Sequence, residues 1–253
     1  MTRFDVLWWV GLAYFAIWLA LPLLAFPLLG PLPGMVIWVL LAPWSALIGM
    51  AALDRLLPES PSGTFAMFAD EGSVRWALKG WAPSVYLAVF QPVCFLSEGF
   101  QRLVLRAFGA HLERGALVTS RTIIREPHRV RLGADCLVGE DVHLLCAYQP
   151  RPKVLVVDEI EIGARTMIGG RCLLAPGARV GSDSLLEYCV ALGAGSTIGA
   201  GSRIGANTSI YNRVRIGDDV RIGKRCLILS GTVVPDGARI PADTTLGQGG
   251  DGC

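Results

Sequence analysis

The sequence predicts a mainly β protein whose second half is a parallel β-helix and whose first residues form apolar helices. Every sixth residue from Leu132 to Leu246 belongs to one column of twenty positions, and nineteen of them are Leu, Ile or Val. The first 53 residues contain two long stretches without charge. Because a short repeat buries its apolar face only by stacking on its neighbours, the six-residue period predicts a solenoid.

The repeat also predicts the strands and corners of this solenoid. The residue two positions before the aliphatic one is small or β-branched, and strand alternation places both inside. Gly follows the aliphatic residue at eleven positions, Gly133 and Gly163 among them, and we expect these glycines to turn the corners with positive φ. Three strands and three corners give an 18-residue coil, and the period predicts about seven coils.

This pattern resembles the left-handed parallel β-helix of the hexapeptide-repeat acyltransferases over roughly residues 112–248, and the handedness comes from that resemblance. The segment Leu103–Ala110, followed by Arg125–His128 and Leu132-Gly133, is similar to the membrane-attached C-terminal regions of poly-amino-acid synthetases and to surface-polysaccharide acetyltransferases. The resemblance implies acyl transfer from an acyl-CoA co-substrate, with no permanently bound cofactor, and a homotrimer of parallel prisms.

The outward positions indicate where such a trimer would form. Residues at intervals of 18 are expected to stack, and one outward column contains Leu137, Leu155, Leu173, Ala191, Ser209 and Leu227. An exposed ladder of leucines needs a partner. We expect a subunit interface there; the alternative is that the N-terminal segment covers this face.

The N-terminal residues 1–57 predict a transmembrane helical hairpin. Val6–Leu29 and Met35–Leu53 carry no charge, and each has about the 20 residues that a bilayer core requires. The turn Gly30–Gly34 between them lacks Lys and Arg, whereas Arg3 and Arg55 flank the outer ends. The positive-inside rule therefore predicts a multi-pass protein of the cytoplasmic membrane with its β-helix on the cytoplasmic side. A buried helical hairpin in a soluble domain is the alternative.

Residues 58–111 are expected to join the membrane to the β-helix domain of residues 112–253. Pro58–Gly63 has the composition of a linker. Trp76, Lys79 and Trp81 precede the apolar stretch Val85–Leu96, which favours an amphipathic element at the membrane surface over a third, kinked span. Cysteines at inward small positions, such as Cys172, are predicted to pack in the core without disulfides.

The unit Tyr148–Lys153 interrupts the repeat. It places a large aromatic residue at an inward small position and contains two prolines, so we expect it to leave the prism as a loop instead of forming a normal strand. This stretch resembles the active-site segment of hexapeptide acyltransferases, in which a catalytic His often precedes an extruded loop. Tyr148 occupies that position here, and we expect its hydroxyl to form a hydrogen bond with the acceptor or the oxyanion.

His143 is the expected general base. It is outward, it lies just before the interrupted unit, and Glu161 follows 18 residues later, where stacking would place the carboxylate about 5 Å away. A His oriented by a carboxylate can remove the proton of an attacking hydroxyl or amine. An exposed charge ladder is the alternative interpretation. His128, in an irregular corner beside Pro127, is expected to be structural.

An acyl-CoA site is expected on glycine-rich corners and a basic cluster. The candidates for the pantetheine arm are Gly169 and Gly170 together with the turn Gly193, Ala194, Gly195 and Ser196; the latter resembles the CoA-lining turn of the family. Arg213 and Arg215, in a cluster with Arg203, Arg221, Lys224 and Arg225, are the candidates for the phosphates. The fold itself also requires Gly at these corners, so the glycines are a weak signal for a CoA site. The alternative for the basic cluster is a solvated face or one that binds acidic lipid.

Other chemistries lack support. His143 has no His partner one or two coils away, so a zinc site of three histidines is not expected. The basic residues lack the interleaved aromatics of a single-strand binder, so no nucleic-acid partner is expected. The sequence predicts a membrane-anchored acyltransferase moving an acetyl or short acyl group to a hydroxyl or amine of a membrane-associated small-molecule, glycan or lipid-linked acceptor. The alternatives are a non-catalytic β-helix scaffold and a partner subunit of a membrane synthase.

Overall fold

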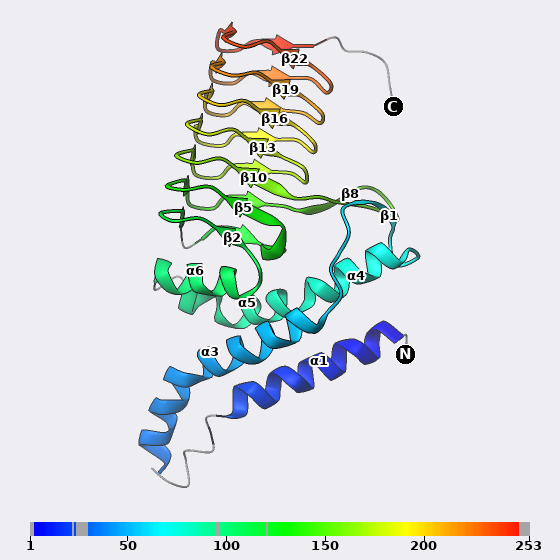
Figure 1. The fold of residues 1–253 in the computed structure, drawn as a ribbon, viewed down its shortest axis with the longest axis vertical. Helices are drawn as coiled ribbons and strands as arrows, with labels where there is room; N and C mark the ends of the chain where they lie inside the picture. The colour runs from blue at the N-terminus through cyan, green and yellow to red at the C-terminus, as the bar shows by residue number, and fades with distance from the viewer. Residues whose placement is uncertain (1–2, 22, 24–29, 95–96, 120, 248–253) are drawn as a thin grey trace.

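A computed structural model of the 253-residue chain describes residues 3–21, 23, 30–94, 97–119 and 121–247. Helices form the base of the molecule, and the coils of the second half stack on this base in chain order (Figure 1). A small β-sheet projects to one side, at the level of the lowest coils, above one of the helices. The chain therefore climbs from the helices at one end to the last coil at the other.

The second half of the chain forms three parallel sheets of seven strands each, one on each side of a prism. Sheet 1 contains β2 (His111–Leu112), β5 (Val130–Leu132), β10 (Ile160–Ile162), β13 (Arg179–Val180), β16 (Thr197–Ile198), β19 (Arg215–Ile216) and β22 (Val233–Val234). Sheet 2 contains β3 (Leu117–Val118), β6 (Leu137–Val138), β11 (Met167–Ile168), β14 (Leu185–Leu186), β17 (Arg203–Ile204), β20 (Arg221–Ile222) and β23 (Arg239–Ile240). Sheet 3 contains β4 (Ile123–Ile124), β7 (His143–Leu144), β12 (Leu173–Leu174), β15 (Ala191–Leu192), β18 (Ser209–Ile210), β21 (Leu227–Ile228) and β24 (Thr245–Leu246). The predicted parallel β-helix of about seven coils is confirmed.

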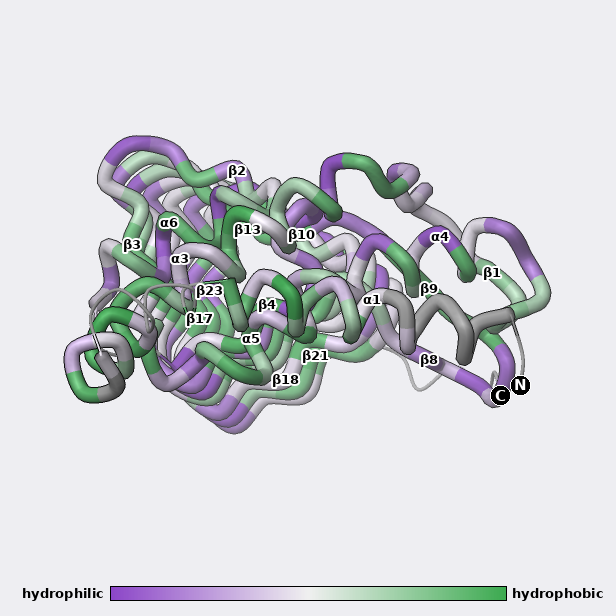
Figure 2. Tube along the Cα trace, turned by 90° about the horizontal axis from the view of Figure 1, so that it is seen from below, coloured by the Kyte–Doolittle hydropathy of each residue, from purple (hydrophilic) through white to green (hydrophobic). Residues whose placement is uncertain are grey.

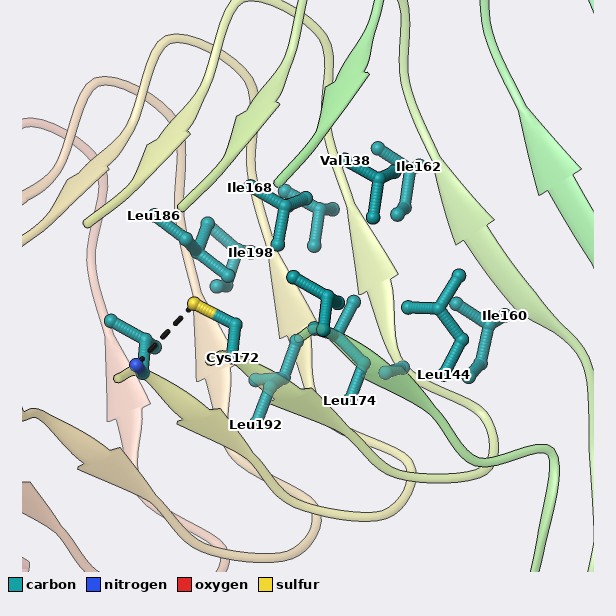
Figure 3. Close-up of a cluster of buried hydrophobic side chains, with 14 of the residues drawn as sticks. Val138, Leu144, Ile160, Ile162, Ile168, Cys172, Leu174, Leu186, Leu192 and Ile198 are labelled. Atoms are coloured by element: carbon teal, nitrogen blue, oxygen red, sulfur yellow. Dashed lines mark hydrogen bonds between the residues drawn. The ribbon is translucent and has the colours of Figure 1, made fainter. Parts of the chain in front are cut away.

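The aliphatic column fills the interior of the prism. Ile162, Ile168 and Leu174, one from each sheet, are buried and meet in one continuous apolar core (Figure 3). The small inward residues link successive coils. The Cys172 thiol donates to the carbonyl of Glu187 at 3.1 Å and accepts from the backbone N–H of Val190 at 3.4 Å. Each described cysteine is free, as the sequence predicts for core packing.

The corners differ from the prediction. Apart from Gly247 (φ 105°) after the last strand, the glycines that follow the aliphatic residues do not have positive φ; the left-handed residue comes two positions later, as at Arg165 (φ 54°) and Gly177 (φ 76°). Gly163 is needed for another reason: a Cβ there would lie 2.5 Å from the backbone nitrogen of Ser182 in the next coil. These glycines therefore allow adjacent coils to approach closely, and the turn itself is made elsewhere.

The interrupted unit leaves the prism, but it does so as a strand. β8 (Ala147–Arg151) and β9 (Val154–Val157) form an antiparallel hairpin, and β1 (Gly63–Ala66) from the linker region adds a third strand in the order β1-β9-β8. Pro150 is tolerated because β8 lies at the edge of this small sheet, where a missing N–H costs no ladder bond. The expectation that these residues cannot form a strand is wrong outside the prism.

The first two described helices pack side by side. α1 (Arg3–Ala20) and α3 (Pro31–Leu56) are joined by side-chain hydrogen bonds, including Trp38 Nε1 to the carbonyl of Leu19 at 2.9 Å. α3 begins at Pro31, with Gly30 as its N-cap, so Gly30–Gly34 forms the first helical turn instead of the predicted connection. Proline suits this position because its missing N–H would have no helical partner there.

Only part of the predicted hairpin has the length of a membrane span. Within the described residues, the segment Leu32–Leu56 is long and apolar enough to cross a membrane, whereas Gly11–Ala20 is a shorter apolar helix. The predicted first span, Val6–Leu29, exceeds α1, which ends at Ala20. Residues 24–29 of that span lie outside the described residues.

Three further helices connect this pair to the prism. α4 (Glu71–Lys79), α5 (Trp81–Cys94) and α6 (Glu98–Ala107) lie between α3 and the first coil (Figure 1). Leu105 of α6 belongs to the core of the β-helix, and Arg106 of α6 donates to the carbonyl of Leu112. α6 therefore covers the lower end of the solenoid, where the first coil would otherwise expose its core.

The linker residues are tied to the base of the prism. Arg129, buried at the corner between β4 and β5, donates to the Ser62 hydroxyl at 2.9 Å and to the carbonyl and hydroxyl of Ser60. Lys79 is buried and forms ion pairs with Asp54 at 3.3 Å and Glu59 at 3.1 Å. Buried charges are costly unless they are paired, so these contacts fix the helices relative to the first coil.

Candidate active site

The structure separates His143 from Glu161. His143 lies on sheet 3 and pairs with Ile123 and Leu173, whereas Glu161 lies on sheet 1 and pairs with Arg131 and Arg179. Thirty residues separate His143 from Leu173, but only eighteen separate Leu173 from Ala191, so the hairpin adds twelve residues to its coil. Because twelve is a multiple of six, the insertion keeps the six-residue phase. It nevertheless places the residue eighteen positions after His143 on a different side of the prism. The predicted His–Glu stacking is therefore wrong.

The same insertion redraws the outward leucine column. Leu137 lies on sheet 2, where it pairs with Leu117 and Met167, and Leu155 is buried in the hairpin opposite Phe65. The outward column that contains Leu173 includes Ile123, His143, Ala191, Ser209, Leu227 and Thr245. The predicted column is correct from Leu173 upward and wrong below it.

Tyr148 lines a cavity of about 430 Å³ at the root of the hairpin. Helices α4 and α5 contribute Trp76 and Trp81, the corner after β4 contributes Glu126, and the hairpin contributes Leu155. The remaining lining residues are Ala77, Gly80, Ser84, Arg125, Leu145, Ala147 and Gln149. The hairpin and α4 project on the same side of the prism in both views (Figures 1 and 2), and the cavity lies between them.

Glu126 is the carboxylate among the lining residues, and no sequence motif marks it. Its side chain is 5% exposed, and Oε1 accepts a hydrogen bond from Trp76 Nε1 at 3.2 Å. Burial raises the pKa of Glu126 to about 7, against the opposing effects of the Trp76 hydrogen bond and of Arg125 and Arg129. An acidic residue in an irregular corner was the available signal, but its burial depends on α4, far away in the sequence.

His128 lies two residues further along the same corner and stays neutral to a lower pH than a typical surface histidine. Burial lowers the pKa of His128 to about 4, and Arg129 and Lys79 add to this effect. Both ring nitrogens are buried without a hydrogen-bond partner in the described part of the chain. A neutral, enclosed imidazole supports the structural role expected for His128.

The predicted CoA residues fall on different edges of the prism. We call the edge at which the chain passes from sheet 3 to sheet 1 the hairpin edge; it contains residues 125–129, 145–159, 175–178, 193–196, 211–214 and 229–232. The turn Gly193–Ser196 and Arg213 lie on this edge, two and three coils above the coil that carries the hairpin. Gly169 and Gly170 lie on the edge between sheets 2 and 3, and Arg215 lies on sheet 1.

Part of the Gly193–Ser196 turn is already engaged within the protein. Ser196 is 0% exposed; its hydroxyl donates to the carbonyl of Tyr211 at 2.7 Å and accepts from the N–H of Val214 at 3.0 Å. The N–H of Ala194 donates to Asn212 Oδ1 at 2.8 Å. The Ser196 side chain therefore faces the core, and a ligand on this edge would contact the outer surface of the glycines.

Two family models match the coils described above. The model of the bacterial transferase hexapeptide (six repeats) matches residues 195–229, and the model of the hexapeptide repeat of succinyl-transferase matches residues 159–211 and 213–248. Residues 159–248 are thus hexapeptide repeats. No curated protein matches it.

Solved structures similar to this chain are distant from it in sequence. A mutant of perosamine N-acetyltransferase from Caulobacter crescentus, in complex with CoA and GDP-perosamine, is 20% identical, with a TM-score of 0.33 and coverage of 60% of each chain. A mutant of the N-acyltransferase AntD from Bacillus cereus is 12% identical, with a TM-score of 0.43 and coverage of 52% of this chain and 80% of that one. The acetyltransferase domain of PglB from Neisseria gonorrhoeae is 17% identical, with a TM-score of 0.32 and coverage of 58% and 60%. The chain thus spans about 60% of the first and third of these structures.

The basic cluster of the hexapeptide-repeat coils divides into paired and unpaired arginines. Arg225 forms two hydrogen bonds with Asp243, at 2.6 and 2.8 Å, and holds the pKa of that carboxyl below its usual value. Arg203, Arg221 and Arg239 are cross-strand neighbours on sheet 2 and line a groove of about 430 Å³. Like charges directly opposite each other are unfavourable, and the carboxylate of Glu187 lines the same groove.

Proposed function

We propose that this protein is a membrane-associated acyltransferase that moves a short acyl group from an acyl-CoA to a hydroxyl or amine of its acceptor. The observation that carries the proposal is the composition of the hairpin edge. The glycine turn at 193–195 and Arg213 lie on the same edge as the hairpin and its cavity. A donor lying along this edge would bring its reactive end to an enclosed acceptor site.

The stacking along the edge supports this arrangement. Backbone hydrogen bonds connect Leu145 to Leu174, Ala175 to Leu192 and Gly193 to Ile210, so the corner residues of successive coils lie above one another. Two coil steps of about 4.8 Å separate Leu145 from Gly193, a span of about 10 Å. Ala175 and Gly193 have small or no side chains, so an extended pantetheine arm could approach the backbone closely at this edge.

The chemistry requires a base, an oxyanion donor and orientation of the two substrates. The Tyr148 hydroxyl at the cavity is the proposed donor to the acceptor or to the oxyanion. His143 remains a candidate base beside the hairpin coil, but it acts without the predicted carboxylate, because its cross-strand neighbours are Ile123 and Leu173. The other predicted CoA residues are weaker candidates for this donor site, because they lie away from the hairpin edge. Gly169 and Gly170 are on the edge between sheets 2 and 3, and Arg215 is on sheet 1.

The membrane assignment rests on the exposed apolar surface of α3. Large apolar side chains are exposed along this helix, namely Leu32, Met35, Val36, Val39, Leu40, Leu41, Trp44, Ile48 and Leu56. So much exposed apolar area on one helix is unusual for a surface in water. We propose that α3 spans the bilayer, that α1 inserts beside it, and that the β-helix faces the cytoplasm as the flanking arginines predict.

A non-catalytic scaffold, or a partner subunit of a membrane synthase, is the second candidate. One observation favours it: the position expected for a loop histidine is Tyr148, and His143 has no carboxylate cross-strand neighbour. A scaffold would need the hairpin and the base helices only as contact surfaces.

Binding and transfer measurements separate the two candidates. The full-length protein in lipid nanodiscs is titrated with CoA by calorimetry and then incubated with labelled acetyl-CoA and membrane extract. We expect CoA binding, and Arg213→Asn should weaken it by 10-fold or more, because a charge-assisted contact to phosphate contributes roughly 1.5–3 kcal/mol. Arg165→Asn is the matched control, since Arg165 has the same left-handed backbone on another edge and pairs with Asp183. A wild-type protein that neither binds CoA nor transfers label would establish the scaffold instead.

A further inference from the structure

We propose that the cavity at the root of the hairpin holds the attacking group of the acceptor and that Glu126 is the catalytic residue that accepts its proton. This inference rests on the proposed acyl transfer and deepens it, because it assigns the base to a carboxylate instead of a histidine. Three separate parts of the chain enclose the cavity: α4–α5, the corner at Arg125-Glu126 and the hairpin. Its volume of about 430 Å³ lies in the range of pockets that bind small molecules.

The position of Glu126 suits this role. It lines the cavity together with Tyr148, and the indole of Trp76, another lining residue, donates to its Oε1 at 3.2 Å. A carboxylate can accept about four hydrogen bonds, so this contact and a backbone hydrogen bond from Cys146 leave capacity for a substrate hydroxyl or amine. His143 does not line this cavity, which is why the carboxylate is the better-placed base.

The surroundings leave Glu126 able to exchange a proton near neutral pH. Burial opposes ionisation, while Trp76, Arg125, Arg129 and a backbone hydrogen bond from Cys146 favour it, and together they hold the pKa of Glu126 at about 7. The other titratable groups around it add little charge: burial raises the pKa of the Cys146 thiol well above its usual value and lowers that of His128 to about 4, so both are neutral at pH 7. A base works best when its pKa is close to the working pH.

The proposed step balances without any further reactant. The acceptor oxygen or nitrogen attacks the thioester carbonyl of the acyl-CoA, and the Glu126 carboxylate takes its proton as the new C–O or C–N bond forms. The tetrahedral intermediate then expels the CoA thiolate as the C–S bond breaks. The proton passes from Glu126 to the thiolate, which gives CoA thiol and restores the carboxylate.

The cavity also indicates how a membrane-anchored acceptor would arrive. Its walls include α4 and α5, which connect the apolar helix α3 to the prism, so it lies at the helical end of the molecule. The glycine turn at 193–195 lies further up the same edge. Donor and acceptor would thus approach the cavity from opposite ends.

Transfer kinetics of Glu126→Gln test the proposal. The full-length protein in nanodiscs is assayed with labelled acetyl-CoA and membrane extract from pH 5.5 to 9. We expect the wild-type rate to rise through pH 7, and Glu126→Gln to lower kcat by about 10²–10⁴-fold with CoA affinity unchanged. Glu159→Gln is the control, because Glu159 lies on the same edge, pairs with Arg131 and does not line the cavity.

A second measurement does not depend on turnover. Because the Trp76 indole donates to Glu126, tryptophan fluorescence of the wild type should titrate near pH 7, and both Glu126→Gln and Trp76→Phe should abolish that transition. If the wild type transfers acyl groups and Glu126→Gln keeps the wild-type kcat, or if no such transition exists, Glu126 is not the base. If the wild type binds no CoA and transfers nothing, the proposed function fails and the role of Glu126 fails with it.

Discussion

Glu126 and His128 stand two residues apart at one corner, and burial shifts their pKa values in opposite directions. In each case the cause is the same, since an enclosed site disfavours the charged form. The pKa of the Glu126 carboxyl rises to about 7, and that of the His128 imidazole falls to about 4. Both shifts should appear in the pH dependence of folding stability.

At the residue scale, Glu126→Gln should stabilise the protein at high pH. The Glu126 pKa is about 4.5 in an unfolded chain and about 7 when folded, so from pH 4.5 to pH 7 the unfolded state ionises first. Stability is therefore lost as pH rises through this window and does not return above it. Gln removes this loss, and we expect a gain of about 1–3 kcal/mol at pH 8 and almost none at pH 4.5.

Melting temperatures of the two proteins in detergent at pH 4.5 and pH 8 measure the difference. His128 acts in the opposite direction, since its lowered pKa costs stability as pH falls below about 6.5, but it is present in both proteins and cancels. The same gap in melting temperature at both pH values would contradict the burial of an ionisable Glu126. A stability gain that accompanies loss of activity is the usual cost of a functional site.

At the scale of the elements, two kinds of glycine make the corners of the β-helix. One kind follows the aliphatic residue and allows the next coil to approach; the other takes the left-handed backbone. Gly181 is of the first kind, because a Cβ there would lie 2.5 Å from the backbone nitrogen of Ala200. Gly237 is of the second kind, with φ 67° and no neighbour within 4 Å of an added Cβ.

Substitution should distinguish these two roles. Gly181→Ala forces two coils apart, and we expect it to cost about 1–3 kcal/mol, as overpacking does in cores. Gly237→Asn should cost well under 1 kcal/mol, because Asn tolerates left-handed backbone and Asn207 already takes the same turn position, with φ 58°, at a corner on another edge. Thermal unfolding of both variants measures this. Equal destabilisation would show that close approach is not what constrains Gly181.

At the scale of the whole molecule, the base helices and the prism are fixed to one another by buried polar contacts. Arg129 binds Ser60 and Ser62 of the linker, and Lys79 binds Asp54 at the end of α3. With the helical end held this way, the sides of the prism are the surfaces free to meet other subunits. Sheet 3 presents Leu173, 39% exposed, between His143 and Ala191.

We expect Leu173→Arg to disrupt a homotrimer, because it places a charge on an apolar face that a partner subunit would cover. Light scattering of the detergent-solubilised protein should show a shift from three subunits towards one. Thr197→Arg is the matched control, because the outward column of sheet 1 already carries Arg179 and Arg215 beside it. An oligomer of unchanged mass after Leu173→Arg would remove sheet 3 from the interface.

The sequence by itself determined the solenoid, its core and the apolar helices. A six-residue period with Leu, Ile or Val at nineteen of twenty positions permits only a stacked coil, since each unit needs its neighbours for burial. The burial of the cysteines at inward repeat positions, Cys136, Cys172 and Cys226, and the extrusion of residues 147–157 follow from the same pattern. The place of Tyr148 outside the prism follows too, because its unit breaks the repeat, and its role in a site stays a prediction.

The tertiary structure alone decided which residues meet across coils. The twelve extra residues of the hairpin leave the six-residue phase intact, so the period continues unchanged while every later strand is assigned to a different side of the prism. That is why Glu161 moves to sheet 1 and Leu173 stacks on His143. The burial of Glu126 could not be predicted from the sequence either, because it comes from Trp76 on a helix fifty residues earlier. Local pattern fixes which side chains point inward, whereas neighbours across coils depend on the number of residues per coil and on helices packed from elsewhere.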